Sequence, residues 1–264
     1  MRHSFLDRYA YQDTAVHHLD GRVKLIVLVA LNVAVVTTSL SAWWALAGYL
    51  MLVGAVVAVG RIPPLYVLSR GLVIMPFVAL AAASAPFLEG GRMLWSTSLF
   101  GLSLQVSEHG ARTAAAVIAR SMICVAALIT FMSITPMAEV LDSLRRLRAP
   151  AILVMLIGFA YRYVFVLVDE AQRLKVARDS RSFGGKTLWH LRVLGRMIGT
   201  LLIRSCERAE RVYAAMLSRG YDSNGAVSAN HPAPLKRTDV GFLAGSLATL
   251  LMLRTSAIWL PRML

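Results

Sequence analysis

The sequence is short of charged side chains and of the motifs that mark catalytic proteins. Only 16% of its 264 residues are charged, and it has no GxxxxGKS, GxxxxGKT, HExxH or GxSxG stretch. The residues therefore predict neither a loop that holds nucleotide phosphates nor a hydrolytic centre. Its two cysteines, Cys124 and Cys206, form no CxxC pair and are expected to be small buried residues in different helices.

What the sequence has in excess is apolar and basic residues. Hydrophobic types make up 57% of the chain, and the net charge is +14. In a soluble protein such a charge would suggest nucleic acid. Here the basic residues border apolar spans or lie in one block, as the positive-inside rule expects of cytoplasmic loops. The composition predicts an integral membrane protein that contacts lipid and no nucleic acid.

The apolar spans predict an all-α fold with about five transmembrane helices. A crossing helix needs roughly 20 residues. Five segments meet that need: Val23–Thr38, Trp43–Gly60, Gly71–Leu88, Arg112–Met132 and Val240–Leu260. Trp43, Trp44, Trp95 and Trp259 fall near the predicted outer interface. No cleavable signal precedes the first span, which begins after a polar stretch of mixed charge.

A sixth apolar run, Ala149–Val168, is assigned by the parity of the crossings. Basic residues before the first span place the N-terminus inside, and the loop from Glu89 to Gly110 then lies outside. If the sixth run crossed, the basic block from Arg173 to Arg219 would also lie outside, against the rule. We therefore expect this run to stay at the cytoplasmic face.

Local signals predict three helices on the cytoplasmic side. Thr135-Pro136 is a suitable N-cap and N1 pair for a short helix. A second helix runs from Pro150 to about Phe183, and a third from Thr187 to Arg219 with Gly220 as its C-cap. The predicted organisation is residues 1–134 (the N-terminal segment and four spans), 135–220 (the helices), 221–238 (a flexible connector) and 239–264 (the last span).

The two long helices each end in an arginine between small residues. These are Ser180-Arg181-Ser182 and Ser218-Arg219-Gly220. A guanidinium held at the end of a rigid helix can pair with carboxylates at fixed geometry. Two such helix ends indicate binding to a partner at two points. The third helix also has an apolar stripe, expected to pack on a partner: Leu188, Leu191, Leu194, Ile198 and Leu202.

A metal-like cluster precedes the first span. His17, His18 and Asp20 lie on the predicted cytoplasmic side. Short histidine pairs are weak metal motifs, so we favour a structural or capping role and expect no metal or cofactor bound by this chain.

Several stretches together resemble the transmembrane (T) component of energy-coupling factor transporters, of the cobalt/nickel CbiQ type. Residues 17–24 are similar to that family's HxLDxRxK motif, and residues 161–167 to its YRYxFxL stretch. Both arginine signatures fit as well, although each has serine where alanine is usual. The resemblance covers nearly the whole chain, and Thr135-Pro136 begins what resembles the first coupling helix.

This resemblance implies a non-catalytic subunit in a bacterial cytoplasmic membrane. A dimer of cytoplasmic ABC-type ATPases would dock on the signature arginines and use ATP. Their closure would move the coupling helices, which would reorient a separate substrate-binding membrane subunit carrying cobalt. A small accessory membrane subunit is a further expected partner. Nickel or vitamin cargo, a self-sufficient metal permease and a non-transporting membrane scaffold remain as alternatives.

Overall fold

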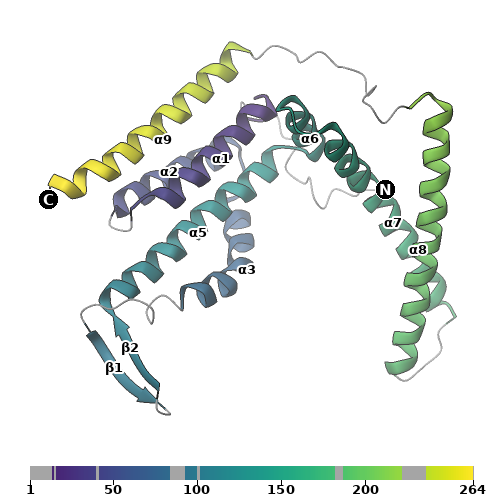
Figure 1. Ribbon diagram of the computed structural model, residues 1–264, viewed down its shortest axis with the longest axis horizontal. Helices are drawn as coiled ribbons and strands as arrows, with labels where there is room; N and C mark the ends of the chain where they lie inside the picture. The colour runs from purple at the N-terminus through teal and green to yellow at the C-terminus, as the bar shows by residue number, and fades with distance from the viewer. Residues whose placement is uncertain are drawn as a thin grey trace. The chain divides into compact units, whose positions relative to one another are not determined.

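The computed structural model describes residues 14, 16–39, 42–83, 93–99, 102–181, 187–221 and 236–263 (Figure 1). It divides into two compact units. One, the bundle unit, comprises residues 2–143 and 234–264, and the other, the paired-helix unit, comprises residues 144–233.

The bundle unit consists of membrane-type helices and one β-hairpin. Its elements in chain order are α1 (Gly21–Thr37), α2 (Trp43–Val59), α3 (Pro64–Ala82), β1 (Met93–Leu99), β2 (Leu102–Ser107), α5 (Glu108–Ile134), most of α6 (Met137–Arg146) and α9 (Arg237–Met263). The paired-helix unit contains α7 (Ala151–Asp179) and α8 (Thr187–Ser218).

The helices of the bundle unit begin and end where local chemistry dictates. Asp20 caps α1 by accepting a 3.0 Å hydrogen bond from the backbone N–H of Arg22. Pro64 supplies the first residue of α3, where a missing N–H costs nothing. α2 ends in a Schellman motif, because Ile62 N–H donates to Val57 and Arg61 N–H to Ala58. Arg61 thus takes a left-handed φ of 50°, a position usually held by glycine.

The core of the bundle unit joins α1, α2, α5 and α9. Its buried members include Val35, Tyr49, Ile123 and Leu250. Tyr49 is fully buried, and its hydroxyl lies 3.4 Å from that of Thr38 at the end of α1. Arg120 of α5 reaches the carbonyl oxygen of the same threonine. These polar contacts fix the end of α1 against α2 and α5.

The ends of α1 and α9 define two levels of the bundle unit. At one end, Ser39 donates to the carbonyl of Ala257, so the start of α2 lies beside the end of α9. Trp43, Trp44 and Trp259 gather at this level, 45%, 39% and 67% exposed. At the other end, Asp20 meets Asp239 at the start of α9. These three indoles of the bundle unit therefore share the level expected of an interfacial aromatic belt.

The predicted membrane class is confirmed, with changes in the bounds of single elements. Among the described helices, α3, α5, α7 and α9 are long and apolar enough to cross a membrane, and α2 is apolar but shorter. α3 begins seven residues before the predicted span, so Arg70 lies within this helix. The loop before α5 contains an addition that we did not predict, the antiparallel hairpin of β1 and β2, with Leu99 opposite Leu102.

The cytoplasmic-side helices also differ in detail from expectation. α6 begins at Met137, and the carbonyl of Pro136 accepts its first hydrogen bonds. The buried Thr135 hydroxyl has no hydrogen-bond partner among the described residues, so it is not the predicted cap. α7 has 29 residues and ends at Asp179, before the predicted Phe183. Cys206 on α8 is exposed, which contradicts the prediction that both cysteines are buried.

Candidate functional site

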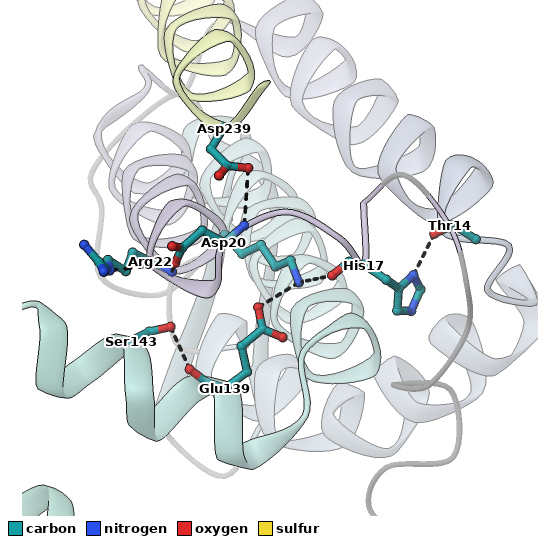
Figure 2. A network of polar contacts seen from close by, with 8 residues as sticks. Thr14, His17, Asp20, Arg22, Glu139, Ser143 and Asp239 are labelled. Carbon is teal, nitrogen blue, oxygen red and sulfur yellow. Dashed lines mark hydrogen bonds and ion pairs between the residues drawn. The ribbon is translucent and has the colours of Figure 1, made fainter. Parts of the chain in front are cut away.

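A polar junction at the start of α1 gathers three segments that are far apart in the sequence. We define the polar junction as His17, Asp20, Lys24, Glu139, Ser143 and Asp239. Figure 2 shows how the segment before α1, the short helix α6 and the first turn of α9 meet there. All six residues belong to the bundle unit.

Lys24 is the centre of this junction. Its side chain is only 5% exposed, and its ammonium donates to the carbonyl oxygen of His17 at 2.9 Å and to Glu139 Oε1 at 3.1 Å. A buried ammonium is stable only when such partners replace water. The Lys24–Glu139 ion pair thus connects the first turns of α1 and α6, which are 115 residues apart.

Asp239 joins α9 to the same place. It lies at the third position of α9, is 3% exposed, and accepts from the backbone N–H of Lys236 at 3.1 Å, as the third residue of a capping box does. Its other oxygen lies 3.4 Å from the backbone N–H of Asp20. One carboxylate therefore serves the start of α9 and the residue that caps α1.

The predicted histidine and aspartate cluster has structural contacts in this junction. Asp20 is the N-cap of α1, as we expected, and pairs at 3.8 Å with Arg22. His17 Nδ1 is hydrogen-bonded to the Thr14 hydroxyl at 2.6 Å, while its carbonyl receives Lys24. Within the described residues, no group of three or more His, Cys, Asp or Glu side chains has metal-binding geometry.

The paired-helix unit positions both signature arginines at exposed helix ends. Arg181 follows the C-cap of α7, and Arg219 follows the last residue of α8. Gly220 then takes a φ of 75°, and the N–H groups of Gly220 and Tyr221 close a Schellman motif on Leu217 and Met216. The predicted Gly220 cap is confirmed, while Ser182 lies outside the described residues.

The residues next to these arginines form hydrogen bonds or ion pairs with other groups. Ser180 and Ser218 hydroxyls donate to backbone carbonyls one turn earlier, at 3.1 and 3.0 Å, so serine in place of the usual alanine is satisfied locally. Asp179 is held by Arg178 at 2.6 Å. Within the described part of the chain, neither Arg181 nor Arg219 has a carboxylate partner.

The two arginines lie at opposite ends of the unit because α7 and α8 run antiparallel (Figure 1). Glu170 of α7 pairs with Arg204 of α8, and further along the Tyr221 hydroxyl donates to Met155 Sδ at 2.8 Å. Arg219 is therefore near the level of Met155, 26 residues before Arg181. At 1.5 Å per residue this separates the two arginines by roughly 35–40 Å.

An apolar groove lies between the two helices and was missed by our reading of the sequence. Its volume is about 460 Å³, and α7 contributes Leu156, Phe159 and Tyr163 to its wall while α8 contributes Ala209 and Val212. Among the described residues, Arg208 is the single charged side chain that lines it. The sequence signal was available, since Ala209, Val212 and Met216 recur at helical spacing on α8.

The predicted leucine stripe is a second surface, on the N-terminal half of α8. Leu191, Leu194, Ile198 and Leu202 are 60%, 43%, 59% and 63% exposed, and the side chain of Leu188 lies outside the described residues. None of the four lines the groove. α8 thus presents an open apolar stripe along one half and a groove wall along the other.

The helices, the level of tryptophans and the basic paired-helix unit define a multi-pass membrane protein. The chain belongs to the family of CbiQ, cobalt transport protein, which it matches over residues 12–229.

Three relatives are similar to the chain, and two of them are named as cobalt transport proteins. An uncharacterized protein of Methanocaldococcus jannaschii is 30% identical over 136 residues, covering 52% of this chain and 51% of that protein. The cobalt transport protein CbiQ of Rhodobacter capsulatus is 27% identical over 157 residues, covering 60% of this chain and 64% of its own. A putative fused cobalt transport protein CbiMQ of Methanocorpusculum labreanum is 25% identical over 88% of this chain and 40% of that protein. The match thus spans about half of the first relative and less than two thirds of the second.

Proposed function

We propose that this chain is the transmembrane coupling (T) subunit of an energy-coupling factor importer that carries cobalt ions. Two cytoplasmic ATPases dock on Arg181 and Arg219, and the chain transmits their ATP-driven movement to a separate substrate-binding membrane subunit. The chain itself hydrolyses no ATP and holds no cofactor.

One observation carries this proposal. Two exposed arginines stand at opposite ends of an antiparallel helix pair, and neither has a carboxylate partner among the described residues. A dimeric partner presents the same acidic pocket twice at a fixed distance, and a stiff helix pair can fill both pockets at once. Displacement of the two pockets on ATP binding would then move the helices that join them.

The groove and the leucine stripe supply the second half of the proposal. Both surfaces are apolar, and neither is covered by another described part of the paired-helix unit. A contiguous apolar surface beside a basic one is typical of a partner or lipid contact. We assign the groove between α7 and α8 to an apolar helix of the substrate-binding subunit, which such a groove receives through its shape and its lack of charge. The name of the fused CbiMQ relative supports an association between cobalt transport components.

The test of the proposal is reconstitution. The chain is purified with the ABC-type ATPases and the substrate-binding subunit of its own organism and placed in vesicles, and cobalt uptake is measured with and without ATP. Uptake should need all components and ATP. Cobalt uptake by this chain alone would instead establish a self-sufficient permease, and stable complexes without uptake would establish a scaffold.

The same preparation tests the orientation of α7, which is apolar enough to cross a membrane but which we propose lies at the cytoplasmic face. Cysteines are introduced in a background with Cys124 and Cys206 replaced, at Lys175 near the end of α7 and at Ser98 in β1. A membrane-impermeant maleimide should label Lys175→Cys only from the cytoplasmic side and Ser98→Cys only from outside. Outside labelling at position 175 would show that α7 crosses.

A further inference from the structure

The short helix α6 lies directly on the first turn of α1. A Cβ atom added at Gly21 would lie 2.4 Å from Ser143 Oγ and 2.9 Å from Glu139 Cγ, closer than real side-chain contacts permit. Ser143 is 2% exposed, and its hydroxyl donates to the carbonyl of Glu139 at 2.7 Å. Gly21 is thus the residue that lets the two helices touch at this point.

Beside this close approach lies the ion pair of Lys24 and Glu139. The lysine is buried by neighbours from four helices. A small apolar cavity of about 70 Å³ beside it is lined by Leu28 of α1, Val56 of α2, Phe131 of α5 and Phe242 of α9. Glu139 keeps 30% of its side chain exposed. The Lys24 side chain therefore stays inside the bundle unit. Glu139 lies at the surface, and its ion pair with Lys24 holds α6 against α1.

We propose that Lys24 is a positioning residue, whose ion pair with Glu139 fixes α6 on the first turn of α1 so that α6 and the bundle move as one body during transport. This inference rests on the proposed coupling role, because it states which helices keep their positions relative to one another while the signature arginines move. The motion must then be taken up after α6, where the structure has a sharp stop. Arg148 adopts a left-handed φ of 64° and Pro150 follows.

The alternative is that α6 slides over α1 in each cycle, with the ion pair broken and reformed. Removing one partner of a buried pair strands the other charge and is strongly destabilising, whereas replacing both by apolar residues is often tolerated. The design below therefore removes both charges together.

The experiment uses a disulfide between positions 21 and 143 in two ways. Its rate of formation reports how close α6 lies to α1, and once formed it prevents the two helices from separating. Gly21→Cys and Ser143→Cys are introduced into the complete complex, with Cys124 and Cys206 replaced by alanine and serine. The atom nearest to a Cβ at position 21 is Ser143 Oγ, which this design replaces by the sulfur to be bonded, while the Glu139 side chain must shift slightly. Uptake by the reduced cysteine pair is therefore first compared with uptake by the complex that keeps Gly21 and Ser143. Copper phenanthroline oxidises the two thiols to a disulfide, and dithiothreitol reduces it. The rate of disulfide formation is measured by maleimide mass tagging, and ATP-dependent cobalt uptake is measured in vesicles. Each is done with native Lys24 and Glu139 and with the double change Lys24→Met and Glu139→Met.

With the native pair, we expect rapid disulfide formation and uptake that stays within about twofold of the reduced protein. The apolar double change should slow disulfide formation and reduce uptake by roughly tenfold, since two methionines can keep the fold but lack the directional ion pair that holds α6 at one position on α1. Oxidation of that variant should restore uptake, and reduction should abolish it again. Lys175→Met, an exposed lysine on α7, is the matched control and should change neither quantity.

Two results would overturn the proposal. One is loss of uptake on oxidation of the protein with native Lys24, reversed by dithiothreitol, because α6 would then have to move over α1. The other is an unchanged disulfide rate and unchanged uptake in the apolar double variant. If the unmodified complex takes up no cobalt with ATP, the proposed coupling function fails, while the disulfide rate still tests the position of α6.

Discussion

The bundle unit and the paired-helix unit differ in how much of their apolar surface they bury within the protein. In the apolar window of α5, 33% of the residues are buried within the protein, against 6% in that of α7. In the Lys24–Glu139 ion pair of the bundle unit the lysine side chain is 5% exposed. In the Arg211–Glu207 pair on α8 the two side chains are 68% and 56% exposed. The bundle unit encloses a core around α5, although α3 and α9 leave most of their apolar windows open at 17% and 11% buried, while the paired-helix unit keeps nearly all of its apolar and charged groups open.

This difference bears on where we propose that partners act. Open apolar area on a stiff helix pair is costly in water, so it is retained where another surface covers it. α7 and α8 have 29 and 32 residues, and each helix end carries one of the signature arginines. We expect a region built in this way to transmit a displacement, and the core of the bundle unit around α5 to serve as the frame against which that displacement is measured.

Removal of both signature arginines should give the largest effect. We expect Arg181→Ala with Arg219→Ala to abolish cobalt uptake and co-purification of the ATPases, because desolvated bidentate arginine pairs are worth roughly 2 kcal/mol or more each. Lysine at the same positions should rescue poorly, since it lacks the planar fork. Pull-down on a tagged ATPase measures binding. Arg196→Ala, an exposed arginine in the interior of α8, is the control, and equal binding by the double variant and this control would refute the docking role.

A break in the middle of α8 should have the next largest effect. Ile198→Pro removes a backbone donor and kinks the helix at a cost of roughly 3 kcal/mol. The helix ends with Arg181 and Arg219 stay available, so we expect ATPase binding to persist while uptake per ATP hydrolysed falls severely. Ile198→Ala, which keeps the helix, is the control. Full uptake by the proline variant would move the coupling step to α6.

Charges introduced on the two apolar surfaces of α8 should have a smaller, selective effect. Val212→Asp places a carboxylate in the groove, and Leu194→Asp places one on the stripe. A lone charge in an apolar contact is costly to bury, so both should loosen the substrate-binding subunit. We expect Val212→Asp to weaken its co-elution more, because the groove surrounds its occupant. A stronger effect of Leu194→Asp would make the stripe the principal docking surface.

The sequence predicted the helices better than their junctions. Membrane spans, the two long helices and the Gly220 cap follow from local patterns of apolar residues and helix-end chemistry. The Lys24–Glu139 contact does not, because a separation of 115 residues carries no local signal. The hairpin of β1 and β2 was also missed, although Leu102, Leu104 and Val106 alternate with polar residues, which is a strand signal. Thr135 was wrongly predicted as the cap of α6. The carbonyl oxygen of Pro136 accepts the first hydrogen bonds of this helix, from the N–H groups of Glu139 and Val140.

The smallest effects should separate the two units most clearly, because they compare one type of ion pair in two settings. Glu207→Gln removes an exposed i, i+4 pair whose atoms are 3.9 Å apart, and such pairs contribute within about 0.5 kcal/mol. Glu139→Gln keeps an acceptor for Lys24 but removes the charge opposite a buried ammonium, which should cost about 1–3 kcal/mol. Thermal unfolding in detergent measures both. Since the substitution is the same, any difference reports the setting, and equal shifts would mean that the polar junction is no more tightly bound than the surface of α8.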